Sequence, residues 1–430
     1  MPDLSLLFGA RRVLGLAALV ALPLACSDEG PAGGGDLGAA DQGGTDLGAT
    51  DDMPDLGDPD MGPPERGYVV SAGTFTPSGI NSYVGLAPEL GPEVTLDPSD
   101  AIEVPGIALL YVRPGSGEFF VDSVSNLTLT KYEVSDGAFV ERAQLGFAGL
   151  GFSSVQRLSA NAFASDTRAY LVESGTLQLV TWNPTTMEIV DTEELSELAP
   201  DDEAVSAFVY APVLRDGFAF FPFAYSDPVA DEVLPEAVML VLDLANGTTR
   251  VIRDASCGDA IYPMTTPSGD IVIASGTVNA AGEFLERPRV GASCLRRIPA
   301  GSLDFDPDYH PTIASFVDGD TAGGLVPGPA GSAFVRVLLE ERVPSTTAST
   351  TPLTAAPLWS WWRIDIEAGT GVVAPIDPSA GRFTAFSVGG RSFATVSAAD
   401  FSRTTLLETT AEPPVAALDL QGIAAGIGRL

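Results

Sequence analysis

The sequence predicts an all-β fold, a seven-bladed β-propeller, preceded by a lipoprotein signal and a disordered acidic linker. Three observations support the propeller. Pairs of short strands recur seven times, no segment shows the periodicity of a long amphipathic helix, and 46 Gly and 34 Pro residues favour many turns. The chain has 430 residues, more than the roughly 250–300 that one hydrophobic core fills. A propeller accommodates a chain of this length without one large core, because each blade packs only on its neighbours.

Each repeat consists of an apolar strand, a turn containing Gly, Pro, Asn or Asp, and a second short strand. Alternating apolar and polar residues are typical of half-buried strands, and turns of this composition join hairpins. Corresponding positions recur every 42 to 68 residues, near the period of about 40–50 that a four-stranded blade requires. The clearer copies span 130–140, 179–190, 240–252, 295–303 and 362–373, and the weaker ones span 83–96 and 404–420.

Further apolar strands precede four of these hairpins and complete the blades. They cover residues 169–172, 218–221, 271–274 and 334–338. The competing fold is a pair of β-sandwiches, which would need a linker near the middle of the chain, and the sequence shows none. We therefore assign residues 67–430 to one propeller domain.

Residues 1–25 have the features of a secretory signal. Arg11 and Arg12 precede an apolar run over 13–25, which is shorter than the roughly 20 residues of a membrane span. The run ends Leu-Pro-Leu-Ala-Cys, which resembles the bacterial lipobox, with Cys26 as the lipidated residue. In bacterial lipoproteins a serine after the lipidated cysteine usually accompanies sorting to the outer membrane, so the resemblance implies this destination through Ser27. We therefore expect a lipid anchor at the outer membrane or cell surface, with the periplasm or an ordinary secreted protein cleaved near Ala25 as alternatives.

Residues 26–66 predict a disordered linker. From 27 to 66 the segment has no aromatic residue, and it carries 11 acidic residues against one basic one. It cannot bury enough apolar surface to offset chain entropy, and a coil of this length spans roughly 35 Å. Calcium binding by the repeated Asp-Leu-Gly is the alternative, although the spacing is not that of an EF-hand loop.

Composition excludes several functions. The formal net charge of −35 leaves no basic surface for nucleic acid. His310 is the one histidine, so a site with several histidine ligands is excluded, and we expect no metal centre. No Gly-x-Ser-x-Gly elbow, P-loop or dinucleotide fingerprint is present, so we predict no catalytic residue and no cofactor.

Cys257 and Cys294 are the two cysteines of the predicted propeller. An exported chain passes through an oxidising compartment, so the pair predicts a disulfide across the junction of the fourth and fifth repeats. The closed loop of 37 steps would contribute roughly 3–4 kcal/mol in the chain-entropy model. Free thiols or a metal pair are the alternative.

Three residues are candidates for ligand binding. His310 and Tyr309 precede residues 312–317, which we predict to be an inner strand beside the central channel, where propellers bind ligands. Arg157 is the third candidate, because guanidinium groups hold anions well. A structural histidine and surface ion pairs of the arginines are the alternatives. Trp182, Trp359, Trp361 and Trp362 are expected to pack between blades, with ligand stacking as the functional alternative.

One stretch resembles a known family. Ala169-Tyr170, the run from Trp182 to Ile189 and the preceding Gly151-Phe152-Ser153-Ser154 resemble bacterial lipoprotein propellers of the myxobacterial siderophore-transport (myxochelin, MxcI-like) type. The resemblance is strongest over residues 100–200. It implies a non-enzymatic accessory component in iron-siderophore uptake, with a ferric siderophore and an outer-membrane transporter as partners, and it supplies no catalytic residue.

Two alternatives to this function remain open. Some propellers are calcium-dependent lactonases or hydrolases, which need carboxylates and amides around a channel metal. The other alternative is a surface scaffold for protein interactions without a small ligand. The acidity of the predicted propeller, which keeps a charge of −26 after the signal and linker are removed, opposes an anionic ligand unless arginines cluster locally.

Overall fold

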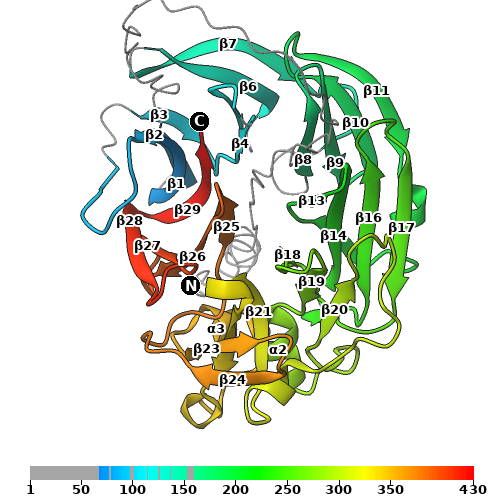
Figure 1. Ribbon diagram of the computed structural model, residues 1–430, viewed down its shortest axis with the longest axis vertical. Coiled ribbons are helices and arrows are strands. Elements are labelled where there is room, and N and C mark those ends of the chain that lie inside the picture. The colour runs from blue at the N-terminus through cyan, green and yellow to red at the C-terminus, as the bar shows by residue number, and fades with distance from the viewer. Residues whose placement is uncertain are drawn as a thin grey trace, which may run out of the picture.

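The computed structural model describes residues 67–430 except 77–78, 97–100, 114, 124–125, 136 and 153–158. The signal, the lipidation site Cys26 and the acidic linker lie outside the described residues. Strands dominate the described part of the chain and form seven antiparallel sheets around a common axis (Figure 1). The predicted seven-bladed β-propeller is confirmed.

The first blade joins the two ends of the described chain. Its innermost strand is β29 (Ile423–Arg429), which comes last in the sequence and pairs with β1 (Tyr68–Thr76). Outward from β1 follow β2 (Gly79–Ala87) and β3 (Ile102–Pro105). Backbone hydrogen bonds between the first and last strands of the described chain therefore close the ring.

The second to fourth blades follow in chain order. Blade two has β4 (Leu110–Val112), β5 (Glu118–Ser123), β6 (Asn126–Ser135) and β7 (Ala138–Gly146). Blade three has β8 (Ser159–Ser165), β9 (Arg168–Glu173), β10 (Gln178–Asn183) and β11 (Glu188–Glu194). Blade four has β12 (Ser206–Val209), β14 (Phe218–Asp227), β16 (Ala237–Asp243) and β17 (Thr249–Asp254), with β13 (Val213–Arg215) and β15 (Glu232–Val233) also paired to β14.

The remaining blades complete the ring. Blade five has three strands, β18 (Met264–Thr265), β19 (Ile271–Ala274) and β20 (Leu295–Ile298). Blade six has β21 (Ala322–Pro327), β22 (Ala333–Leu338), β23 (Trp359–Asp365) and β24 (Thr370–Val373). Blade seven has β25 (Ala385–Val388), β26 (Arg391–Ser397), β27 (Arg403–Glu408) and β28 (Val415–Gln421).

Five of the predicted hairpins are confirmed as the outer strand pairs of their blades. They are β6–β7, β10–β11, β16–β17, β23–β24 and β27–β28. Asx turns shape these connections. Asp365 Oδ1 accepts the backbone N–H groups of Glu367 and Ala368, at 3.0 and 2.8 Å, and Gly369 then takes a φ of 69° that favours glycine.

Two of the predicted hairpins are wrong. The second strand of the predicted hairpin at 83–96 is a loop over residues 88–96. The strand that pairs with β2 is β3, which comes after this loop. In blade five, β20 has no hairpin partner at 300–303. Thr312 instead forms an isolated bridge with Cys294, at the outer edge of the sheet. Both errors arise where an insertion separates two strands that pair, which a local pattern cannot show.

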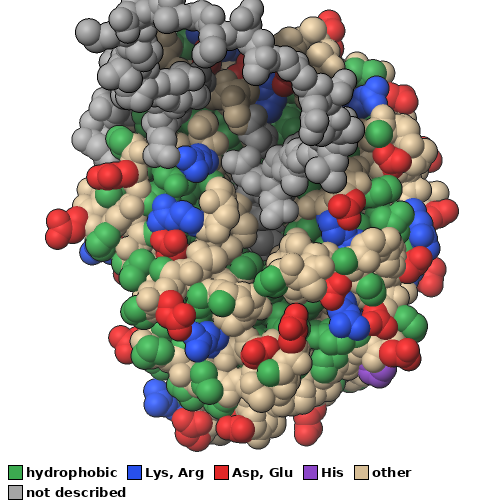
Figure 2. Space-filling view, in the orientation of Figure 1, with side chains coloured by type: hydrophobic (Ala, Val, Ile, Leu, Met, Phe, Trp, Pro, Cys, Tyr) green, Lys and Arg blue, Asp and Glu red, His purple; other side chains and the backbone are tan. Residues whose placement is uncertain are grey.

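Burial explains why the strands differ along each blade. The central strands β9 and β16 are buried almost throughout, because both faces of the sheet pack on neighbouring blades. The outer strand β11 is exposed along most of its length and is rich in Glu, Asp and Thr. On the face shown in Figure 2, acidic and basic side chains are interspersed. Within the described ranges, no helix is both long and apolar enough to span a membrane.

Three insertions on blades four to six form a small helical cap. They are the loop carrying β15, the segment with α2 (Thr277–Phe284) between β19 and β20, and the segment with α3 (Thr350–Ala355) between β22 and β23. Asp231 joins all three, since it accepts hydrogen bonds from Arg287 Nη2 and the backbone N–H of Thr350, each at 2.8 Å. Figure 1 shows α2 and α3 beside each other over blades five and six.

Candidate functional site

The predicted disulfide is confirmed. Cys257 follows β17 of blade four and Cys294 directly precedes β20 of blade five, and their Sγ atoms are bonded with a Cα–Cα distance of 5.1 Å. Both residues are buried in one core cluster. The bond therefore joins adjacent blades and is structural.

The predicted inner strand at residues 312–317 is wrong, so Tyr309 and His310 are not beside the axis. Ile313–Phe316 is a 3₁₀ helix, and the segment before it lies along β20, the outermost strand of its sheet. The Tyr309 carbonyl oxygen accepts a hydrogen bond from Arg296 Nη1 at 2.8 Å. The Arg297 guanidinium lies 4.4 Å from the centre of the Tyr309 ring. His310 is exposed. The sequence pattern missed this because the apolar residues Ile313, Phe316 and Val317 suit a strand and a helical turn equally well.

Several arginines of the propeller form ion pairs with acidic side chains, which is the alternative given for the arginines above. Arg253 pairs with Glu236 at 2.8 Å and Arg363 with Glu412 at 2.7 Å. Arg296 and Arg297 pair with Asp254 and Asp306 respectively. Arg157, the third ligand-binding candidate, lies outside the described residues. All four tryptophans are buried, and Trp182 of blade three packs on blade two as expected, since it meets the Phe120 ring edge-on at 5.3 Å. Trp359 packs instead against the α2 and α3 segments.

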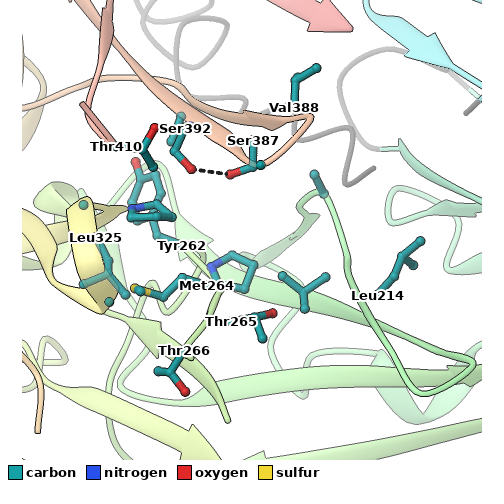
Figure 3. Close-up of a pocket in the computed structure, with 18 of the residues that line it drawn as sticks. Leu214, Tyr262, Met264, Thr265, Thr266, Leu325, Ser387, Val388, Ser392 and Thr410 are labelled. Atoms are coloured by element: carbon teal, nitrogen blue, oxygen red, sulfur yellow. Dashed lines mark hydrogen bonds between the residues drawn. The ribbon is translucent and has the colours of Figure 1, made fainter. Parts of the chain in front are cut away.

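A pocket at the axis, which we call the axial pocket, is the best candidate for a functional site. It encloses about 390 Å³ between blades four to seven, near the lower end of the roughly 300–1,000 Å³ typical of small-molecule sites. Innermost strands supply its walls: β13 contributes Leu214, β18 contributes Met264 and Thr265, and β21 contributes Leu325 (Figure 3). Blade seven closes it with β25 and the Gly389-Gly390 turn.

The chemistry of the axial pocket is apolar with a hydroxyl edge. Ser387 and Ser392 lie 3.0 Å apart, Oγ to Oγ, and Thr410 stands beside them (Figure 3). The Thr265 side chain lies on the opposite wall and is half-buried. None of the described residues lining the pocket carries a charge. Such a surface binds through apolar contact and a few hydrogen bonds, and not through ion pairs.

A buried polar cluster adjoins the axial pocket through Tyr262. Tyr262 lines the pocket, and its ring stacks on Phe383 with 4.8 Å between ring centres. Its electrostatic neighbours are Asp259, Arg382 and Arg336, and Tyr210 is coupled to the same Asp259 and Arg382. Asp259 and Tyr262 lie in the segment before β18, and Arg382 lies in the segment before β25, whereas Tyr210 follows β12 and Arg336 lies on β22.

Asp259 is a buried carboxyl group of this cluster with a strongly raised pKa. It is 5% exposed, its Oδ2 has no hydrogen-bond partner, and the Gly276 Cα lies so close to Oδ2 that a side chain there would clash. Burial raises the pKa of Asp259 from 3.8 to about 7, while the Asn279 backbone N–H and the charge of Arg382 lower it in part. Burial likewise raises the pKa values of Tyr210 and Tyr262. A carboxyl group that titrates near neutral pH is a feature common at functional sites.

The helical cap holds this cluster in place. Arg382 Nε and Nη2 donate to the Thr354 and Thr351 hydroxyls of the α3 segment, at 2.9 and 3.2 Å. In the α2 segment, the Thr277 hydroxyl donates to the Gly381 carbonyl at 3.0 Å. The loop before β25 is thus fixed from both helices. The sequence could not reveal this arrangement, because its members lie in loops of three different blades.

No metal-binding group of three or more His, Cys, Asp or Glu residues occurs in the part of the chain that the structure describes. The residues that line the axial pocket offer hydroxyl oxygens but no carboxylate. Calcium prefers six to eight oxygen ligands, commonly including carboxylates. The donors present at the axial pocket therefore do not fit the calcium site that the hydrolase alternative requires.

Comparisons with protein-family models and with curated protein sequences find no match. Solved structures do resemble this chain. Dihydro-haem d1 dehydrogenase NirN matches with a TM-score of 0.43 and 14% identity over 72% of this chain, which spans 55% of the NirN chain. A candidate 6-phosphogluconolactonase from Bacteroides fragilis gives 0.47, 10% identity and coverage of 87% and 100%. A protein from Lactobacillus plantarum gives 0.47, 9% identity and coverage of 85% and 99%. These similarities concern the fold and do not bear on activity.

Proposed function

We propose that this protein is a non-enzymatic binding protein whose propeller takes a small, uncharged, largely apolar molecule in the axial pocket. The observation that carries the proposal is the lining itself: apolar walls, three hydroxyl groups at one edge and no charge among the described lining residues. The expected lipid anchor at Cys26 would place this binding site at the outer membrane or cell surface. The linker would let the propeller present its ligand to a partner transporter.

The pocket favours a neutral ligand for an energetic reason. An ion moved into an uncharged, apolar pocket loses its hydration without gaining an ion pair, which costs several kcal/mol. An apolar ligand gains about 25 cal/mol for each Å² of apolar surface removed from water. Hydroxyl groups such as Ser387 and Thr410 then discriminate among neutral ligands through hydrogen bonds.

The siderophore role remains a prediction from the sequence resemblance. The lining of the axial pocket limits the kinds of siderophore that it could bind. Ferric catecholate complexes are anionic and have no cation to meet in the described lining of the axial pocket. A neutral complex, or the apolar arm of a larger siderophore, suits this surface better. The test is a titration of the full-length protein with a ferric catecholate, read by tryptophan fluorescence. Saturable quenching at micromolar concentration would support the anionic siderophore over our proposal.

Nile red, a neutral dye whose fluorescence rises in apolar surroundings, tests the proposed binding directly. The protein should bind it saturably at micromolar concentration. Thr265→Phe should fill the pocket and reduce the affinity at least tenfold, because the larger ring takes up the space of the ligand. Thr192→Phe, at an exposed site on β11, is the matched control and should bind as the wild type does. Equal affinity in both variants would refute the proposal.

A hydrolase is the second candidate, because burial raises the pKa of Asp259 to about 7 in the cluster that adjoins the axial pocket through Tyr262. A carboxyl group of this kind can act as a general base. Hydrolysis of a simple γ-lactone, followed with a pH indicator in the presence and absence of calcium, tests this candidate. Turnover that Asp259→Asn abolishes would support the enzyme. Equal rates of hydrolysis with and without the protein would refute the hydrolase and favour the binding function.

A further inference from the structure

The side chain of Arg336 is buried and its charge is not neutralised. Arg336 lies on β22 of blade six, is 1% exposed, and none of its three guanidinium nitrogens has a hydrogen-bond partner. No carboxylate of the described residues forms an ion pair with it, whereas most other buried or half-buried arginines have one. A buried unpaired cation costs several kcal/mol, so the protein must offset this charge in some other way.

A second unpartnered donor lies next to this guanidinium. Trp361 on β23 is the direct partner of Arg336 across the two strands, and its indole ring lies beneath the guanidinium. Trp361 Nε1 is also buried and has no hydrogen-bond partner. Phe383 flanks the guanidinium at 4.8 Å from its ring centre, and the same Phe383 stacks on Tyr262 of the axial pocket. The interior therefore holds neighbouring N–H donors between aromatic rings, without an acceptor.

Aromatic contact alone does not account for this arrangement. Cation–π contacts contribute about 0.5–2 kcal/mol, whereas each unsatisfied buried N–H costs about 1–3 kcal/mol. Arg296 shows how this protein treats a buried arginine elsewhere. Arg296 is 2% exposed and lies near the Phe305 ring, yet it pairs with Asp254 and donates to the carbonyl oxygens of Tyr309 and Asp306. Arg336 has the same burial and none of these partners.

The electrostatics agree with a missing negative charge. Burial lowers the pKa of Arg336 well below its ordinary value, and of the neighbouring groups only Tyr262 opposes this. A guanidinium group nevertheless remains protonated in proteins. A water molecule could accept one hydrogen bond, but it would not balance the charge.

We propose that Arg336 and the Trp361 Nε1 group hold a small monovalent anion of about the size of chloride inside the propeller. Both donors are almost fully buried, and the Arg336 guanidinium lies against the Phe383 ring, which favours a small ion over a larger organic acid. The anion would join β22 and β23 to the loop before β25. It would thereby stabilise the wall of the axial pocket.

Thermal unfolding of the full-length protein at constant ionic strength tests the proposal. Chloride and bromide should raise the midpoint by about 3 °C over an equal concentration of isethionate, which is too bulky for the site, once the halide greatly exceeds its Kd. Arg336→Met should abolish this difference. Arg296→Met, at the buried arginine that has its own partners, should lower the midpoint but keep the halide difference. Equal midpoints of the wild type in all three salts would overturn the proposal.

Anomalous scattering from bromide provides a test that does not depend on how the variants fold. Crystals of the wild-type protein grown in bromide should show an anomalous peak within hydrogen-bond distance of both Arg336 and Trp361 Nε1. A well-ordered map with no peak there, or with a peak only at the surface, would show that no anion is held.

Discussion

Lys131 of blade two donates from Nζ to the backbone carbonyl of Pro184 in blade three, at 3.1 Å. The same nitrogen pairs with Glu118 at 2.7 Å, and the Lys131 side chain is 8% exposed. Other blades repeat this contact with arginine: Arg168 of blade three donates to the Ala245 carbonyl of blade four, and Arg215 of blade four donates to the Ile298 carbonyl of blade five. Cations of one blade thus bind turns and strand ends of the next, and they help to fix the angle between blades.

Replacing Lys131 tests this contact between blades. Lys131→Met should lower the free energy of unfolding by about 1–3 kcal/mol, because the half-buried Glu118 carboxylate and the Pro184 carbonyl lose a charged donor. Denaturant titration measures the change. Arg142→Met is the matched control, since Arg142 and Glu133 form an exposed pair and should matter by less than about 0.5 kcal/mol. A similar loss in both variants would contradict a special role for Lys131.

Stability should fall as the pH rises toward neutrality. Asp122 on β5 is fully buried, and burial raises its pKa from 3.8 to about 7, although the Leu109 N–H and the Tyr111 hydroxyl donate to it. Between these two values the folded state holds a proton that the unfolded state releases. The stabilisation is therefore complete below about pH 4 and is lost as the pH rises through about 7.

The variant Asp122→Asn isolates this effect. It should reduce the loss of unfolding free energy between about pH 5 and about pH 8 by roughly 2 kcal/mol, and the remainder should come from Asp259, which has the same direction of shift. The exposed control Asp377→Asn should follow the wild-type curve. Denaturant titrations across the pH range provide the comparison. A wild-type stability that rises with pH over this range would contradict a buried, protonated Asp122.

Reduction of the disulfide should destabilise the junction of blades four and five. The bond between Cys257 and Cys294 closes a loop with a sequence separation of 37, which is worth about 3–4 kcal/mol in the chain-entropy model. Chemical denaturation with and without reductant should show this loss for the wild type. The double variant Cys257→Ala/Cys294→Ala should be equally weak in both conditions. A wild type that is insensitive to complete reduction would show that the bond adds no stability.

Lipidation at Cys26 is tested by fractionation. Cys26→Ser should move the protein from the membrane to the soluble fraction of a bacterial host that processes lipoproteins, because an acyl anchor supplies the membrane affinity. Cys294→Ser should stay in the membrane fraction and serves as the control. If the Cys26→Ser protein remained in the membrane, lipidation at that position would be refuted.

The fold could be predicted from the sequence because its signal is local. Apolar residues in a short strand such as β10, followed by a turn residue such as Asn183, indicate a hairpin, and the repetition of this pattern predicts the ring. The disulfide between Cys257 and Cys294 followed from composition and export. The predicted strand at 312–317 failed because a short apolar run does not distinguish a strand from a 3₁₀ turn.

The candidate site could not be predicted, because it depends on contacts between blades. Tyr262, Leu325 and Ser387 come from three blades and have no common motif. Arg336 is buried against Trp361 and Phe383, and Asp259 is buried against Gly276 before α2, which are tertiary contacts that a local pattern does not show. His310 and Tyr309 were placed beside the axis because residues 312–317 were predicted to be an inner strand, and the structure has a 3₁₀ helix there instead.

A crystallographic fragment soak of the wild-type protein most directly tests the claim that the axial pocket binds a small uncharged molecule. Neutral, largely apolar fragments should collect between Tyr262, Met264 and Ser387, with a hydrogen bond to at least one hydroxyl of the edge, and crystals of Thr265→Phe should lose them. The claim would be contradicted if neutral fragments left the pocket empty, or if it were filled by anionic fragments alone.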